Sequence, residues 1–111
     1  MLTRYAIFEG HLLDGQADAF RQAVINDLVP MWRQFPGQTA LRITFGLERD
    51  EGAPEYPLIL AITYPDRPTM EAALEHPIRL SSRAATQAAI AGRFEGKIHH
   101  HVTDMLDFPA E

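Results

Sequence analysis

The segment 57–64, with the sequence PLILAITY, is apolar at both its odd and its even positions. Successive side chains of a β-strand point to opposite faces of a sheet, so a strand of this composition must be covered on both faces. The segment 4–12 has the same character, with apolar side chains on each of its faces. We therefore expect two strands in the interior of one sheet.

Two further segments have the pattern of strands. Residues 39–48 alternate strictly between apolar and polar side chains, which is typical of a strand with one buried face. The connection over residues 49–56 is polar and too short to hold a helix, so this strand should pair antiparallel with the strand at 57–64. A last strand is expected over residues 97–106.

A long helix is expected between the first two strands. Apolar residues recur every three or four positions from Ala17 to Phe35, which is the pattern of an amphipathic helix. Pro30 lies within this stretch and lacks a backbone donor, so the helix should be kinked near residues 26–30.

Two shorter helices are expected between the third and fourth strands. The first opens at residues 65–68 and ends at His76, because Pro77 disfavours the helical conformation at the residue before it. Pro77 then begins the second helix, which is expected to run to Gly92 with its apolar residues at Leu80, Ala84 and Ala88. Its solvent-exposed side should hold Arg79, Arg83 and Arg93.

This order of elements is that of a ferredoxin-like βαββαβ sandwich, an α+β fold in which a four-stranded antiparallel sheet has its helices on one face. The first and third strands of this topology lie in the middle of the sheet, which agrees with their apolar composition. A length of 111 residues fits one such domain, over residues 1–111.

The composition excludes several classes of function. A net charge of −5 opposes binding to nucleic acid, and the absence of cysteine excludes disulfides, zinc–thiolate sites and thiol nucleophiles. The apolar stretches fall far short of the ~20 residues that cross a bilayer, so we expect a cytoplasmic protein with no membrane partner. Nothing in the sequence requires flavin, nicotinamide or haem, and no cofactor is expected.

Helices on one side of a sheet leave its other face bare. The alternation predicts that one face meets the helices, with Ala6, Phe8, Leu41, Ile43, Phe45, Ile98, Val102 and Leu106. The outer face then holds Tyr5, Ile7, Arg42, Thr44, His99, His101, Thr103 and Met105, together with apolar residues of the central strand. An apolar band of this width is more than monomers usually expose, so we expect a homodimer in which two such faces meet.

The element order, the length and the helix that ends in Leu74-Glu75-His76-Pro77 resemble the dimeric α+β barrel proteins. That group includes EthD-like proteins, stress-responsive A/B barrel proteins and antibiotic-biosynthesis-type monooxygenases. The resemblance covers nearly the whole chain and implies a homodimeric barrel with a pocket for a small organic molecule. Members of the group include cofactor-independent oxygenases, haem-degrading enzymes and isomerases. The resemblance also implies that His76 belongs to the pocket, and its imidazole suits proton transfer.

The run His99-His100-His101 is the most unusual local feature. Alternation places His99 and His101 on one face of the last strand and His100 on the other. Because the last strand pairs with the first, Glu9 and His11 can lie across from His99 and His101. Three imidazoles and a carboxylate would suit zinc, nickel or iron(II), and the alternative is that they line the dimer seam or the barrel mouth. We favour the structural interpretation and assign no metal site.

Two classes of function follow. The first is a homodimer that binds a small hydrophobic or aromatic molecule, as a cofactor-independent oxygenase or isomerase in which His76 is the catalytic residue. The residues expected to line its pocket are Trp32, Tyr64, Glu9, His11, His99 and His101. The second is a non-catalytic dimerisation or stress-related module with structural histidines, and a metal-binding protein that uses the strand histidines is a further alternative.

Overall fold

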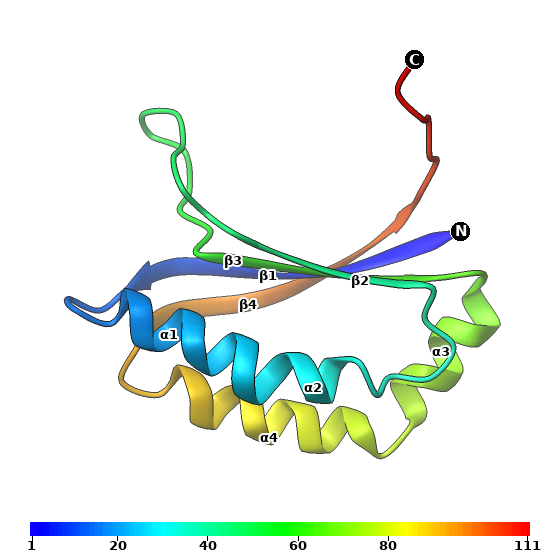
Figure 1. Ribbon diagram of the computed structural model, residues 1–111, viewed down its shortest axis with the longest axis horizontal. Helices are drawn as coiled ribbons and strands as arrows, with labels where there is room; N and C mark the ends of the chain where they lie inside the picture. The colour runs from blue at the N-terminus through cyan, green and yellow to red at the C-terminus, as the bar shows by residue number, and fades with distance from the viewer.

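Four strands form one antiparallel sheet in the order β2-β3-β1-β4, and the helices lie on one face of it (Figure 1). The computed structural model covers residues 1–111. Its strands are β1 (Leu2–Leu12), β2 (Ala40–Phe45), β3 (Leu58–Tyr64) and β4 (Phe94–Asp104). Its helical segments are α1 (Ala17–Ala23), η1 (Val24–Leu28), α2 (Val29–Trp32), α3 (Arg67–Glu75) and α4 (Ile78–Ile90). The ferredoxin-like fold expected from the sequence is confirmed.

The two strands that are apolar on both faces lie in the middle of the sheet. In the pairing of β1 with β3, Leu2 lies opposite Tyr64 and Phe8 opposite Leu58. The other edge of β1 pairs with β4 over the full length of both strands. The predicted positions of the first and third strands are therefore confirmed.

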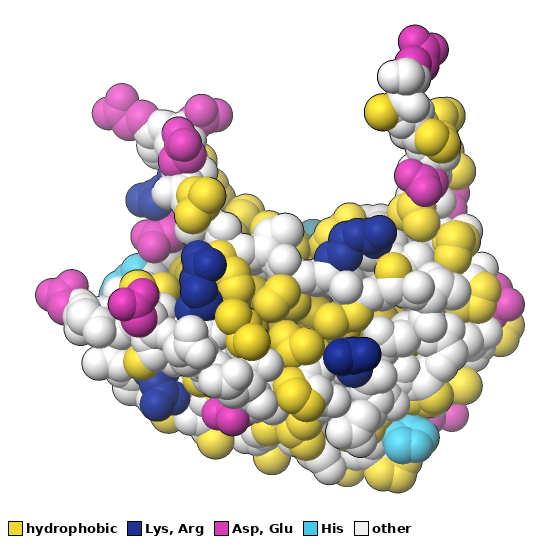
Figure 2. All heavy atoms as spheres, viewed as in Figure 1, with side chains coloured by type: hydrophobic (Ala, Val, Ile, Leu, Met, Phe, Trp, Pro, Cys, Tyr) yellow, Lys and Arg dark blue, Asp and Glu magenta, His cyan; other side chains and the backbone are white.

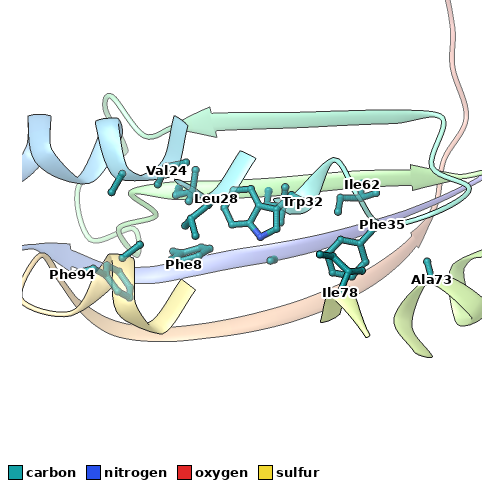
Figure 3. Close-up of a cluster of buried hydrophobic side chains, with 14 of the residues drawn as sticks. Phe8, Val24, Leu28, Trp32, Phe35, Ile62, Ala73, Ile78 and Phe94 are labelled. Carbon is teal, nitrogen blue, oxygen red and sulfur yellow. The ribbon is translucent and has the colours of Figure 1, made fainter. Parts of the chain in front are cut away.

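The long first helical stretch changes its geometry where the kink was expected. Residues 24–28 form a π-helical turn, η1, between the α-helical segments α1 and α2. Pro30 is the second residue of α2, and it has no backbone N–H to donate to a carbonyl of the turn before it. The wider π-helical turn η1 accommodates this missing hydrogen bond. Val24, Leu28 and Trp32 are spaced four residues apart, and all three are buried against the sheet (Figure 3).

Helix α3 begins at a side-chain cap and ends directly before a proline. The carboxylate of Asp66 accepts a hydrogen bond from the backbone N–H of Thr69 at 2.9 Å and so caps the start of α3. His76 leaves the helix with ψ at 143°, and Pro77 begins the next one, as expected. None of the helices combines the length and the apolar composition that crossing a bilayer requires.

One apolar core lies between the sheet and the helices (Figure 3). At one end of it the rings of Phe8 and Phe94 meet edge to face, with centroids 5.7 Å apart. At the other end of the core, only 1 % of the surface of Tyr64 is exposed. The core therefore extends along the whole helix-facing side of β1 and β3.

Two of the residues expected against the helices are not covered by them. Val102 is 44 % exposed and Leu106 is 72 % exposed, because β4 rises away from the helices toward the C-terminus (Figure 1). The second strand is also shorter than expected and ends at Phe45. Gly46 then turns the chain outward, and Leu47, expected to be buried, is 87 % exposed.

The register of β1 and β4 depends on two glycines that face each other. Gly10 lies opposite Gly96, and their φ angles are +153° and +156°. A Cβ at Gly10 would collide with the backbone carbonyl of Glu95, and a Cβ at Gly96 would collide with that of Glu9. The two strands can approach this closely only because both side chains are absent.

We expect Gly10→Ala to lower the free energy of unfolding by about 1–3 kcal/mol more than Gly52→Ala does. Gly52 also has a positive φ, of +81°, but a Cβ there would meet no neighbouring atom, so it serves as the control for backbone strain alone. Chemical denaturation of both variants measures the difference. Equal losses would show that close strand contact at Gly10 is not needed.

Candidate functional site

A cavity of about 260 Å³ lies between the helix-facing side of the sheet and the helices α2, α3 and α4. The strands provide an apolar floor, to which Ala6, Phe8, Leu60, Ile62 and Ile98 contribute. The helical side adds the apolar side chains of Trp32, Phe35 and Leu74. A concave, largely apolar space with a few polar groups is the usual form of a site for a small organic molecule.

The polar groups of the cavity are mainly basic. Arg4 extends from β1, and Arg79 and Arg83 lie one turn apart on α4. His100 extends from β4, where it lies opposite Ala6, so it is a diagonal neighbour of Arg4 on the same face of the sheet. Three elements, β1, α4 and β4, thus place four basic side chains around the cavity.

These groups alter one another's protonation. The pKa of His100 is lowered to about 4, first because desolvation at the cavity disfavours its charged form and then because Arg4, Arg79 and Arg83 repel a further positive charge. Burial lowers the pKa of Arg4, and Arg79 adds to that effect. Burial also raises the pKa of the Tyr64 hydroxyl, while the charge of Arg4 opposes the rise. At neutral pH the cavity therefore holds a neutral imidazole and a protonated phenol beside three guanidinium groups.

The cavity offers hydrogen-bond donors. No aspartate or glutamate lines it, and none of its three arginines forms an ion pair in the protein. The one hydrogen bond from these side chains runs from Nη1 of Arg79 to the carbonyl of Leu74, at a long 3.5 Å. Tyr64 and Trp32 also line the cavity, and their side chains each carry a donor, a hydroxyl and an indole N–H. The arrangement suits a ligand that supplies acceptors.

The predicted site residues lie in three places. Trp32 and Tyr64 line the cavity. His76 is exposed at the end of α3, outside the lining residues, and its Nδ1 accepts a hydrogen bond from the backbone N–H of Ile78 at 3.1 Å. This bond leaves Nε2 of His76 free. The remaining residues lie on the outer face of the sheet or at its edge: Glu9, His11, His99 and His101.

On the outer face, His99 is the centre of a small polar network. Its Nε2 lies 3.3 Å from a carboxylate oxygen of Glu9, and its Nδ1 lies 3.2 Å from Nε2 of His101. Lys97 reaches the other oxygen of Glu9 at 3.7 Å. His11 does not join this network.

The β1–β4 register explains the separation of His11. His11 lies opposite Glu95 and its Nε2 is 3.5 Å from that carboxylate, whereas His99 lies opposite Ile7, four residues along β1. Four residues of strand span ~13 Å, too far for one ion to reach both imidazoles. The expected convergence of three imidazoles and a carboxylate is therefore not found, and no group of three or more His, Asp or Glu side chains is placed to hold a metal.

Three arginines and one histidine of the cavity were not identified as site residues from the sequence. Arg79 and Arg83 were expected to face solvent, on the assumption that Leu80 marks the buried side of α4. Arg83 is exposed as expected and Arg79 is half-buried, but both also line the cavity. In the structure Leu80 is 70 % exposed, and the buried side consists of Ile78, Ser82, Thr86 and Ala89. These residues have the same three- and four-residue spacing, which is the signal that would have placed the arginines beside the core.

Comparison with known proteins supports the fold. No protein-family model matches the chain, and a search of curated proteins found no relative. Among solved structures, an EthD-family protein from Bacillus halodurans superposes with a TM-score of 0.71 at 17 % identity, over 96 % of this chain and 99 % of that one.

Two other solved structures are similar over almost their full length. A putative antibiotic biosynthesis monooxygenase from Nitrosomonas europaea has a TM-score of 0.60 at 16 % identity, over 96 % of this chain and 100 % of that one. A dimeric ferredoxin-like protein of unknown function from Thermobifida fusca has a TM-score of 0.65 at 18 % identity, over 94 % of this chain and 90 % of that one. The resemblance expected from the sequence is confirmed, and at these identities it concerns the fold.

The lowered pKa of His100 should make folding sensitive to acid. Between pH 6.5 and 4 the imidazole is protonated in the unfolded chain but neutral in the folded one, so the unfolded state binds more protons and stability falls as the pH is lowered. We expect His100→Asn to reduce this loss, with an effect moderated by solvent because the side chain is partly exposed. Denaturation midpoints across this pH range measure it, with His101→Asn on the opposite face as the control. An unchanged pH profile in His100→Asn would contradict the environment described for this imidazole.

Proposed function

We propose that this protein is a homodimer that binds one small hydrophobic or aromatic molecule in the helix-side cavity of each chain. The observation that supports this most directly is the cavity itself, which combines an apolar floor with a few convergent polar groups. Trp32 and Phe35 give it an aromatic wall. Its volume exceeds the roughly 150 Å³ that accommodates benzene in an apolar protein cavity, so a single substituted ring fits.

The activity we propose is cofactor-independent oxygenation or isomerisation of the bound molecule. Both reactions begin when a proton leaves a carbon acid, an enol or a phenol, and both need the resulting anion to be stabilised. In the oxygenation the anion is then oxidised by dioxygen, which is the second substrate, and in the isomerisation the proton returns to a different carbon of the same molecule. Neutral His100 is a weak base, because its pKa is lowered to about 4, and the guanidinium groups beside it favour proton transfer by stabilising the anion that remains. The name of the Nitrosomonas europaea protein, a putative monooxygenase, agrees with this chemistry. His76 stays a second candidate for proton transfer through its free Nε2.

The bare face of the sheet supports the homodimer. Its centre is formed by half-buried apolar residues of β1 and β3, among them Ile7 and Ile59. Two projections rise beside this face on the side opposite the helices, the loop between β2 and β3 and the C-terminal tail (Figure 1). Between them the surface forms a saddle (Figure 2).

The projections carry exposed apolar side chains that a second copy would cover. Leu47 begins the loop, and Leu106 and Phe108 lie on the tail, each more than two-thirds exposed. A second sheet placed in the saddle would bury these side chains together with the sheet face. The solved neighbour from Thermobifida fusca is described as dimeric, in agreement with this assembly. In the proposed dimer Glu9, His99 and His101 lie in the seam, and His11 lies at its edge.

Filling the cavity should weaken binding of its ligand. Trp32 is the one tryptophan of the chain, so its fluorescence reports binding of a neutral aromatic probe such as 1-naphthol. Ala6→Leu fills the floor and Ser82→Leu fills the opposite wall, and each should weaken binding at least about tenfold. Ala72→Leu, on the exposed side of α3, is the matched control. Undiminished binding in both cavity variants would place the ligand elsewhere.

Sedimentation equilibrium tests the homodimer. At micromolar concentration the wild-type protein should have twice the mass of one chain, and Ile7→Glu should raise its dissociation constant at least about 100-fold, because it buries a charge in the seam. Ile25→Glu, on the exposed helical surface, should leave the mass unchanged. A wild-type mass equal to that of one chain would refute the assembly.

A further inference from the structure

The cavity concentrates positive charge in a protein that is acidic overall. The chain has 15 acidic and 10 basic side chains, yet three of the basic ones line this one space and no acidic one does. Of the seven basic side chains outside the cavity, three pair with carboxylates: Arg49 with Glu55, Arg67 with Glu71 and Lys97 with Glu9. The arginines of the cavity have no such partner.

The electrostatic repulsion among these arginines is unfavourable unless a negative charge lies between them. Like charges that face one another across a partly dry space repel, and the pKa of Arg4 is lowered by its burial and by Arg79 and Arg83 together. The neighbouring His100 is held neutral first by desolvation and then by the same charges. A negative charge placed among these groups would remove the repulsion, so the cavity stabilises an anion more than a neutral molecule of the same shape.

The donors have the geometry that an oxyacid group needs. A guanidinium group presents a planar fork of N–H donors that matches the two oxygens of a carboxylate. Arg4 approaches from the sheet while Arg79 and Arg83 approach from α4, so the group can be bound from both sides. The hydroxyl of Tyr64 provides a further donor at the same end.

The opposite part of the cavity is apolar. Phe8, Trp32 and Phe35 line it, and a small fully polar anion would leave these surfaces without a partner. The volume of about 260 Å³ has room for one ring and a short acidic substituent. We infer that the ligand class of this site is a small aromatic carboxylic acid, bound as its carboxylate by Arg4, Arg79 and Arg83 with its ring against Trp32. This inference rests on the proposed function and adds to it the charge of the ligand.

Benzoate and benzamide test the inference, because the two have nearly the same shape and differ in charge. Calorimetric titration of the wild-type protein should show benzoate binding at least about tenfold more tightly than benzamide at neutral pH. Equal affinities for the two would overturn the inference and leave the proposed function intact. Failure of both to bind would overturn the proposed function as well.

Arginine variants show where the preference arises. Arg83→Gln changes a largely exposed side chain at the cavity and should reduce the affinity for benzoate about tenfold while leaving that for benzamide within about twofold. Arg79→Gln should act in the same direction. Arg67→Gln, which removes an exposed arginine of α3 outside the cavity, is the matched control. A preference for benzoate that survives both cavity variants would overturn the assignment of these arginines.

Discussion

The pairing of β1 with β4 is the constraint on which both proposed sites depend. Ala6 lies opposite His100, while Ile7 lies opposite His99 and Tyr5 opposite His101. Because side chains alternate along a strand, this register sends one histidine toward the helices and two to the outer face. A shift of one residue would exchange them. The close contact of Gly10 with Gly96 opposes such a shift, since no other pair of residues allows the strands to meet there.

The two faces of the sheet consequently have different chemistry. The helix-facing side holds an apolar space with three unpaired arginines, and its one histidine is kept neutral first by desolvation and then by their charge. The outer face is apolar at its centre, and there His99 is hydrogen-bonded to His101 and lies 3.3 Å from a carboxylate oxygen of Glu9. The first arrangement favours an anionic small molecule, and the second favours a copy of the same face. In the proposed dimer the partner sheet would hold β1 and β4 in place from behind, and so would help to preserve the cavity in front.

The fold could be predicted from the sequence because its signals are local and agree with one another. The apolar run of β3, the kink before Pro30 and the helix break at Pro77 each follow from a few neighbouring residues. The cavity could be predicted only in part, because it depends on how α4 is rotated about its axis. Leu80 and Ile78 both belong to helically spaced rows of small or apolar residues, and packing against the sheet decides which row is buried. The separation of His11 from His99 depended in the same way on a register that alternation alone does not determine.

NMR spectra of the imidazole groups during a titration with benzoate test the division between the two faces most directly. A bound carboxylate offsets the arginine charges and should raise the pKa of His100 from about 4, so in a titration held near pH 5 its resonances should move toward those of the protonated ring. The resonances of His99 and His101, on the other side of the sheet, should stay in place. Movement of His99 and His101 with His100 unchanged would contradict the account, because the ligand would then occupy the face assigned to the second copy.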